Sequence, residues 1–423
     1  MKRRWTRLFA VPIALALVVA ACGSDGDEPK ATDGPAAEPA TEPAGDMDRT
    51  GETIKVGYVN NEGGALSLPE FRTGGEVAIA AINAAGGING AQIEVVGCLS
   101  DVTPEGAINC ANKLIEEDVV LAYMGIELAS EAAIQLWIDA GIPYFSSNSW
   151  GNTEKNSDGA FLLHSAAGAF AAAPAKTFKE LGISNIAVVG EDNPAYQDFL
   201  ASAITPVMEA NNIEFTSIIV DPAAPDWTAA VATAQAAGVD GIWGQLTEPG
   251  CIGLVGATSA INYDKPVFAG SCSFFVPVLG EAAVGVYSSG DVFIPETRAF
   301  APPVIQERLD DYVAQMTAAG NEDQINGFAV APYSSWWEMS IILKTIEGEI
   351  NGTSILDAFK NAGVTEGWLG GDLQCGLAPW PLETSHCGAE MIVWETMLND
   401  DGTVSRAPFM GQGFFEAFPA SGL

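Results

Sequence analysis

The pattern that most constrains the fold is a repeated alternation of short apolar strands with longer helices. The first set alternates strand and helix over residues 54–59, 71–84, 93–96, 104–117, 119–124, 130–140 and 142–145. After a break near His164, a second set begins with a helix and covers residues 172–181, 185–189, 196–211, 215–220, 227–237, 241–243, 250–261 and 267–268. Such alternation is typical of parallel sheets with crossover helices. Two sets in 423 residues predict two α/β lobes.

The residues that follow the predicted strands are the first candidates for a binding site. In open α/β sheets, ligands bind beyond the carboxyl ends of the strands. If two lobes face each other, these ends line one cleft between them. The segments concerned lie at residues 60–67, 125–130, 146–150, 191–196, 245–248 and 271–274.

The N-terminus indicates where the chain works. Four basic residues precede a mostly apolar run over residues 8–21, which is the layout of a secretory signal. The run is shorter than the roughly 20 apolar residues that span a bilayer. Val19-Ala20-Ala21-Cys22 resembles the bacterial lipobox, in which the cysteine thiol receives a lipid and becomes the N-terminus after cleavage. We therefore expect a signal peptide at residues 1–21 and a lipid on Cys22; the alternative is an ordinary signal with an unrelated cysteine.

Composition separates a tether from the folded region. Residues 22–52 are rich in Pro, Ala, Gly, Asp and Glu and contain almost no large apolar side chains, so they should form a disordered, lipid-anchored linker. The anchor would hold the folded region at the outer face of the bacterial cytoplasmic membrane, or in the periplasm. The chain has 54 acidic and 18 basic residues and a net charge of −36, which disfavours binding to nucleic acid or anionic lipid headgroups.

Six cysteines remain once Cys22 is assigned to the lipid, namely Cys98, Cys110, Cys251, Cys272, Cys375 and Cys387. An even number in an exported chain indicates disulfides. Six cysteines allow many pairings, but their clustering favours the local ones, 98 with 110, 251 with 272 and 375 with 387. A metal site is not expected, because the sequence has only two histidines, His164 and His386, and no Cys-x-x-Cys motif.

Three motifs carry a resemblance to a known family. They are Asn60-Asn61-Glu62-Gly63-Gly64, Glu70-Phe71-Arg72-Thr73-Gly74 and Ile82-Asn83-Ala84-Ala85-Gly86-Gly87-Ile88-Asn89-Gly90. They resemble the opening of the type I periplasmic binding proteins, and more narrowly that of the leucine/isoleucine/valine-binding branch of ABC importers. Residues 140–143 before a serine-rich loop, and a closing hairpin predicted at residues 391–402, add to this likeness. The resemblance covers nearly all of residues 53–423.

The resemblance implies two Rossmann-like α/β lobes joined by three crossover strands, with the ligand cleft between the lobes and with crossings near His164, Val292 and Met391. It divides the chain into an N-terminal lobe and a C-terminal lobe, residues 53–164 with 293–390 and residues 165–292 with 391–423. Members of the family close their lobes around a ligand and present the closed form to a membrane permease. We therefore expect a monomer that binds a small solute without a cofactor and partners ABC permease subunits.

The resemblance also suggests which residues contact the solute. The serine-rich loop after the strand at 142–145 matches the place where the family binds a carboxylate through N–H groups and hydroxyls; the alternative is that these serines cap the next helix. Tyr196 matches a tyrosine that offers a flat wall and a hydroxyl, unless it packs against its own helix. The candidate contacts are Leu66, Ser67, Asn148, Ser149, Trp150, Tyr196 and, after the strand at 267–268, Ser271.

One departure from the family bears on the solute. Relatives that bind amino acids usually place an acid after the strand at 267–270 to hold the ammonium, whereas this chain has Ser271-Cys272 there. A buried ammonium without a countercharge is costly. Glu127 and Glu248, which both follow strands, are candidates to replace that acid. If neither faces the cleft, an amide, a carboxylate or an aromatic acid is favoured over an α-amino acid. The sequence thus predicts a small polar or amphipathic solute, such as a branched-chain amino acid or a related amide or carboxylate.

Other classes of function fit the sequence less well. It contains neither a Gly-x-Ser-x-Gly nucleophile elbow nor a Gly-x-x-x-x-Gly-Lys phosphate loop, so an enzyme is not expected. A ligand-sensing domain of the same fold, partnering a membrane receptor, is the alternative to an importer component.

Overall fold

The computed structural model describes residues 48–62, 67–149 and 151–423. The predicted signal, Cys22, Leu66, Trp150 and most of the linker lie outside the described residues. Structure begins before the predicted end of the linker, because Arg49 is buried and donates a hydrogen bond to the carbonyl of Ile346, 3.0 Å away. In the described part of the chain, no helix is long and apolar enough to cross a membrane.

The first sheet has six strands, all parallel, in the order β11-β5-β4-β3-β1-β2. The strands are β1 (Thr53–Asn61), β2 (Gln92–Ser100), β3 (Ala122–Met124), β4 (Tyr144–Ser146), β5 (Ala160–Ser165) and β11 (His386–Gly388). Every residue of β3, β4 and β5 is buried. Strands of this kind are largely apolar because crossover helices cover both faces of a parallel sheet.

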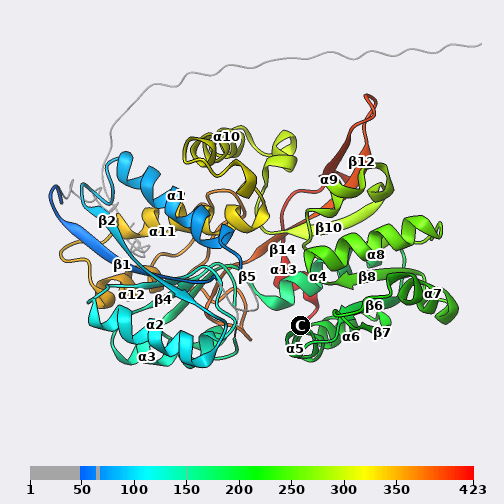
Figure 1. Cartoon of the computed structure of the whole chain (residues 1–423), viewed down its shortest axis with the longest axis horizontal. Coiled ribbons are helices and arrows are strands. Elements are labelled where there is room, and N and C mark those ends of the chain that lie inside the picture. Colours follow the sequence, from blue (N-terminus) through cyan, green and yellow to red (C-terminus); the bar gives the residue numbers. More distant parts are fainter. Residues whose placement is uncertain (1–47, 63–66, 150) are drawn as a thin grey trace, which may run out of the picture. The chain divides into compact units, whose positions relative to one another are not determined.

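Helices cover both faces of the first sheet, with α1 and α11 on one side of β1 and α2 and α3 on the other (Figure 1). The helices are α1 (Glu70–Ala84), α2 (Pro104–Glu116), α3 (Ile134–Asp139), α10 (Pro303–Ala318), α11 (Gly327–Leu343) and α12 (Gly352–Lys360). Thr103 begins α2 by accepting a hydrogen bond from the N–H of Gly106. Gly74 lets α1 approach α11, because a Cβ there would lie 2.0 Å from the carbonyl oxygen of Ala329.

The second sheet runs in the order β13-β12-β10-β9-β8-β6-β7, with β14 paired to β12. Its strands are β6 (Asn185–Glu191), β7 (Glu214–Val220), β8 (Gly241–Gln245), β9 (Val267–Phe268), β10 (Val286–Gly290), β12 (Glu390–Leu398), β13 (Val404–Pro408) and β14 (Phe415–Glu416). The strands from β7 to β10 are parallel, whereas β12 and β13 form an antiparallel hairpin. This hairpin, the β12–β13 hairpin, is the closing hairpin that the sequence predicts.

Two groups of helices cover the second sheet. Their bounds are α4 (Ala167–Glu180), α5 (Pro194–Phe199), α6 (Thr205–Ala210) and α13 (Ala417–Ser421) in one group, and α7 (Trp227–Ala237), α8 (Glu248–Ala260) and α9 (Phe275–Leu279) in the other. The helix predicted at 196–211 is present as a continuous helical segment over residues 194–210, but its middle turn, Leu200–Ile204, is π-helical and separates α5 from α6. Pro206, which has no N–H to donate, lies just after this π-helical turn.

The chain passes between the two sheets three times. It leaves the first sheet after β5, returns to the helices of the first sheet after β10, and crosses again between β11 and β12. The predicted fold class, two α/β lobes dominated by parallel strands, is confirmed.

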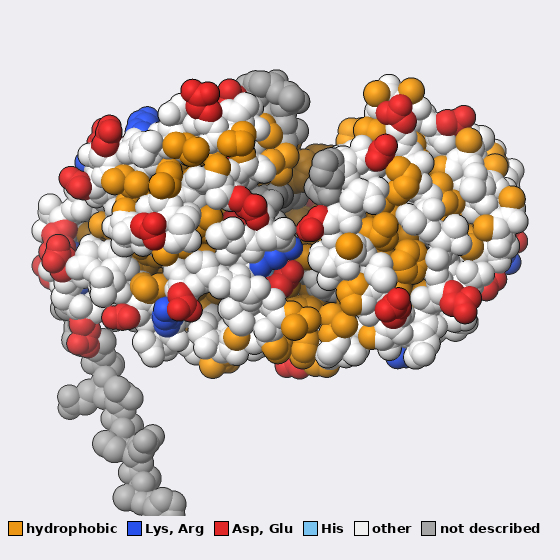
Figure 2. All heavy atoms as spheres, turned by 90° about the horizontal axis from the view of Figure 1, so that it is seen from below, with side chains coloured by type: hydrophobic (Ala, Val, Ile, Leu, Met, Phe, Trp, Pro, Cys, Tyr) orange, Lys and Arg blue, Asp and Glu red, His pale blue; other side chains and the backbone are white. Residues whose placement is uncertain are grey.

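The six cysteines other than Cys22 form three disulfides, namely Cys98–Cys110, Cys251–Cys272 and Cys375–Cys387. These are the local pairs that the clustering in the sequence favours. The first disulfide joins β2 to α2, and the second joins α8 to the loop after β9. On the face drawn in Figure 2, acidic side chains are widespread and lysine and arginine are sparse, in agreement with the negative net charge.

Candidate functional site

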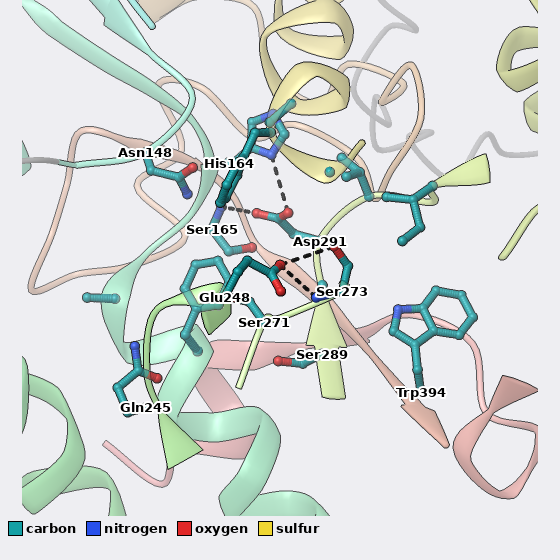
Figure 3. A pocket seen from close by; sticks show the side chains of 18 of the residues that line it. Asn148, His164, Ser165, Gln245, Glu248, Ser271, Ser273, Ser289, Asp291 and Trp394 are labelled. Carbon is teal, nitrogen blue, oxygen red and sulfur yellow. Dashed lines mark hydrogen bonds and ion pairs between the residues drawn. The ribbon is translucent and has the colours of Figure 1, made fainter. Parts of the chain in front are cut away.

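The strand ends of both sheets line one cavity of about 370 Å³. Its lining residues at or directly after strands are Asn148 and Ser149 after β4, His164 and Ser165 in β5, Gln245 in β8, Ser271 and Ser273 after β9, and Ser289, Gly290 and Asp291 in or after β10. Figure 3 shows several of these side chains around the same space. This is the position expected for a ligand of open α/β sheets, and the volume is within the roughly 300–1,000 Å³ of small-molecule sites.

Aromatic side chains form the apolar part of the lining. They are Phe71 on α1, Phe170 on α4, Phe199 on α5, Phe328 on α11 and Trp394 on β12. The rings of Phe71 and Phe328 stack with their centroids 5.3 Å apart. Because the five rings come from helices and strands of both sheets, an apolar group in the cavity would contact both lobes at once.

A buried ion pair joins the first and second crossings at the cavity wall. Nδ1 of His164 lies 3.3 Å from Oδ1 of Asp291, and the N–H of Ser165 donates to Oδ2 of Asp291 at 3.0 Å (Figure 3). Burial alone would lower the pKa of His164, but the carboxylate of Asp291 outweighs it, so the pKa of His164 is raised. By the same attraction the pKa of Asp291 is lowered, although burial alone would raise it. The pair therefore favours a charged imidazolium and a charged carboxylate.

A chain of hydroxyls continues from His164 into the first lobe. Nε2 of His164 lies 3.2 Å from Oγ of Ser335, which lies 3.1 Å from Oγ of Ser147. Ser147 in turn contacts the hydroxyl of Tyr123 at 2.9 Å. The hydroxyl of Ser147, in the predicted serine-rich loop, is thus bonded within the protein, while Asn148 and Ser149 line the cavity.

Glu248 begins α8 and holds the loop that follows β9. Its Oε1 accepts the N–H of Ser273 at 2.8 Å (Figure 3). Its Oε2 accepts the N–H of Phe274 at 2.9 Å. Burial raises the pKa of Glu248, while these N–H groups and the charge of Arg406 oppose that rise. Glu248 is therefore an acidic group fixed at the cavity wall.

Arg406, on β13, also lines the cavity and is only 2% exposed. Burial lowers its pKa, and the charges of Glu296 and Glu248 oppose that effect. Sequence reasoning missed Arg406, as it missed Asp291 and the cavity position of His164. Gln245 and Ser273 do fall within segments that the sequence singles out as following strands.

The structure brings four of the predicted site residues to this cavity, namely Asn148, Ser149, Glu248 and Ser271. Ser67 is exposed and is not part of the lining. Glu127 is fully buried elsewhere, where its carboxylate accepts hydrogen bonds from Nδ2 of Asn61 and from the N–H of Ala129, each at 2.8 Å. In this structure Glu127 thus joins the end of β1 to the loop after β3.

The structure also places Tyr196 away from the cavity lining. Asn193 caps α5 by accepting the N–H of Tyr196, and the ring then lies over β6, where a Cβ on Gly190 would be 2.1 Å from it. The hydroxyl lies 3.2 Å from Oγ of Ser217 on β7. The Tyr196 side chain therefore packs against β6 and β7 of the second lobe.

The described residues hold no group of three or more histidine, cysteine or acidic side chains arranged to bind a metal ion. What they do hold is a solute-sized cavity with aromatic walls and fixed charged groups, at the strand ends of two α/β lobes. This architecture defines a two-lobed binding protein. The sequence profile of the periplasmic binding protein family matches residues 53–376, so the chain belongs to that family and has its type I fold. Membership makes it an extracytoplasmic solute-binding protein.

Solved structures of similar fold come from substrate-binding proteins of ABC transporters. One from Sphaerobacter thermophilus has 20% sequence identity and a TM-score of 0.70, over 87% of this chain and 99% of its own. The branched-chain amino acid transporter protein LivJ from Streptococcus pneumoniae, solved with isoleucine, has 20% identity and a TM-score of 0.65, over 84% of this chain and 100% of its own. A solute-binding protein from Rhodopseudomonas palustris HaA2, solved with p-hydroxybenzoic acid, has 18% identity and a TM-score of 0.69, over 88% of this chain and 99% of its own. No curated protein sequence matches this chain significantly.

Proposed function

We propose that the protein is the solute-binding lipoprotein of an ABC importer, which captures a small amphipathic solute by lobe closure and delivers it to a membrane permease. The observation that carries this proposal is the shared lining of the cavity. Asn148 and Ser149 come from the first lobe, and Glu248 and Ser271 come from the second. A solute that bonds both sets stabilises the arrangement in which they lie close together, which is the physical basis of ligand-driven closure.

The aromatic walls and the polar strand ends favour a solute with an apolar body and one or two polar groups. Of the two acids considered as partners for an ammonium, Glu248 lines the cavity and Glu127 does not. An α-amino acid is therefore compatible with the site, and so is an aromatic or aliphatic acid. The proteins of similar fold from Streptococcus pneumoniae and Rhodopseudomonas palustris were solved with isoleucine and p-hydroxybenzoic acid, respectively; we take one solute from each class as probes.

The N-terminal segments complete the proposal. A signal peptide at residues 1–21, a lipid on Cys22 and a linker from residue 22 would tether a monomer near its permease. Intact-mass measurement of protein from the membrane fraction should show a mature chain that begins at Cys22 and carries a lipid. An unmodified, freely secreted chain would contradict this part of the proposal.

The binding claim is tested by thermal shift and calorimetry with isoleucine, 4-hydroxybenzoate and related acids. A true ligand at 100 times its Kd stabilises the folded protein by about 2.7 kcal/mol. Glu248→Gln should weaken binding of isoleucine more than binding of 4-hydroxybenzoate, because only the amino acid has an ammonium. Glu127→Gln is the matched control, since Glu127 is a buried acid outside the cavity. Chemical conversion of a bound solute, or no binding across the panel, would contradict the proposal.

A further inference from the structure

Arg406 is a buried cation with too few partners. It is 2% exposed, and its one hydrogen bond to a described residue runs from Nη2 to the carbonyl of Ser273 at 3.4 Å. Its Nε is buried and has no hydrogen-bond partner. Among the described residues, no carboxylate lies within the 4.0 Å of an ion pair with its guanidinium. Removing a charge from water without a partner is costly, so an anion from elsewhere would be strongly favoured.

Glu248 and Glu296, the two acids whose charges act on Arg406, do not serve as its ion-pair partner. Glu248 uses one oxygen for the N–H and hydroxyl of Ser273 and the other for the N–H of Phe274. Glu296 is exposed and so is hydrated. Both raise the pKa of Arg406 only through space, against the larger effect of burial. The guanidinium thus keeps an unused Nε donor, and Arg406 lines the cavity together with Glu248 and Ser273.

The β12–β13 hairpin places an aromatic side chain on the same face as this cation. In its register Trp394 lies opposite Pro408, and Thr396 lies opposite Arg406. Residues directly opposite each other in an antiparallel pair, and residues two apart in a strand, share a face of the sheet. Trp394 and Arg406 therefore project from the same face of the hairpin, and both line the cavity.

We propose that Arg406 binds the carboxylate of the solute, so that the cavity selects acids whose apolar body packs on Trp394 and the phenylalanines. An arginine fork matches the two oxygens of a carboxylate, and the aromatic surroundings favour a carboxylate on an apolar body over a small inorganic anion. The inference rests on the proposed function and narrows it, because amides and other neutral analogues are excluded as preferred solutes.

The test compares each acid with its own amide. Benzoate, 4-hydroxybenzoate, octanoate and isoleucine are titrated calorimetrically against benzamide, 4-hydroxybenzamide, octanamide and isoleucinamide. At least one acid should bind the wild-type chain roughly 10- to 150-fold more tightly than its amide, which corresponds to about 1.5–3 kcal/mol for hydrogen bonds to a charged group. Arg406→Gln should reduce that ratio to near one, and Arg406→Lys should restore part of it. Arg298→Gln, which alters an exposed arginine away from the cavity, should leave the ratio unchanged.

The acid-to-amide ratio separates binding from folding, because a purely structural role of Arg406 would weaken both members of a pair alike. Equal affinity for acids and amides in the wild type, or an unchanged ratio in Arg406→Gln, would overturn the inference and leave the solute-binding function standing. Failure of the wild type to bind any acid or amide would overturn the proposed function together with this inference.

Discussion

Replacing Asp291 by asparagine tests the buried ion pair that joins two of the crossings. Oδ2 of Asp291 accepts a hydrogen bond from the N–H of Ser165 at 3.0 Å, and its Oδ1 lies 3.3 Å from Nδ1 of His164. Asparagine keeps the shape and can still accept one hydrogen bond, but it removes the charge. A hydrogen bond to a charged group contributes about 1.5–3 kcal/mol and a neutral one about 0.5–1.5 kcal/mol, so two weakened bonds should lower the free energy of unfolding by about 2 kcal/mol.

The loss should depend on pH. The folded pKa of His164 is raised above its ordinary 6.5, so the stability that the pair gains from the charged imidazolium is fully present below about pH 6.5 and is lost as the pH rises through the folded pKa. The folded pKa of Asp291 is lowered, so its contribution is present above its ordinary 3.8 and is lost only as the pH falls through the folded value. Near pH 5.5 both contributions are present, so the loss of about 2 kcal/mol should have its full size. Above the folded pKa of His164 the imidazole is neutral, and the loss should be smaller.

The assay is urea denaturation followed by tryptophan fluorescence, near pH 5.5 and near pH 8.5. The difference in stability between wild type and Asp291→Asn should be larger at the lower pH. His386, whose pKa is lowered by burial, titrates in both proteins, and so does Glu338, whose pKa is raised by burial; their effects largely cancel in the difference. Asp310→Asn, which breaks an exposed pair with Arg298, is the control and should have no measurable effect. Equal losses at the two pH values, or no loss, would refute the reasoning.

Three further predictions concern stability and binding. Replacing Cys98 and Cys110 by serine should lower the free energy of unfolding by about 3 kcal/mol, the value for closing a loop of similar length, and an unchanged Tm would contradict a disulfide there. Gly74→Ala should lower Tm because the methyl group meets the backbone of α11, whereas Gly97→Ala, with open space around its Cβ, should leave Tm nearly unchanged; equal Tm values for the two variants would show that the helices do not pack as described. Tyr196→Phe should remove about 1 kcal/mol with its hydroxyl contact and leave solute affinity intact, and a clear loss of affinity would return this tyrosine to the binding site.

Much of the fold could be predicted because each strand and helix carries its own periodic pattern. The strand ends then identify Asn148, Ser149, Glu248 and Ser271 as neighbours of a cleft before any coordinates are known. The cysteine pairing can be predicted from spacing, since the two cysteines of each pair lie only 12 or 21 residues apart in the sequence. These features depend on local chemistry and on the general geometry of parallel sheets.

The rest depends on contacts between distant parts of the chain. The pair of His164 with Asp291 joins residues 127 positions apart, and nothing in either local sequence indicates the other; the Asp291 position was not singled out at all. Arg406 lies on β13, and the register between β13 and β12 decides which face of the hairpin carries its side chain. Tyr196 follows a strand, which is where a ligand contact is expected. However, Asn193 caps α5 by accepting the N–H of Tyr196, and the Tyr196 ring then packs against β6.

The central claim is that the cavity at the strand ends binds a small solute, and blocking the cavity tests it most directly. Ser271 is exposed and lines the cavity, so Ser271→Phe should fill the space without disturbing the core. Calorimetric titration of the purified chain with the panel of acids should show saturable binding of one solute per chain to the wild type, and binding at least roughly tenfold weaker to an equally stable Ser271→Phe. Binding of the same solute with the same affinity to both proteins would contradict the claim.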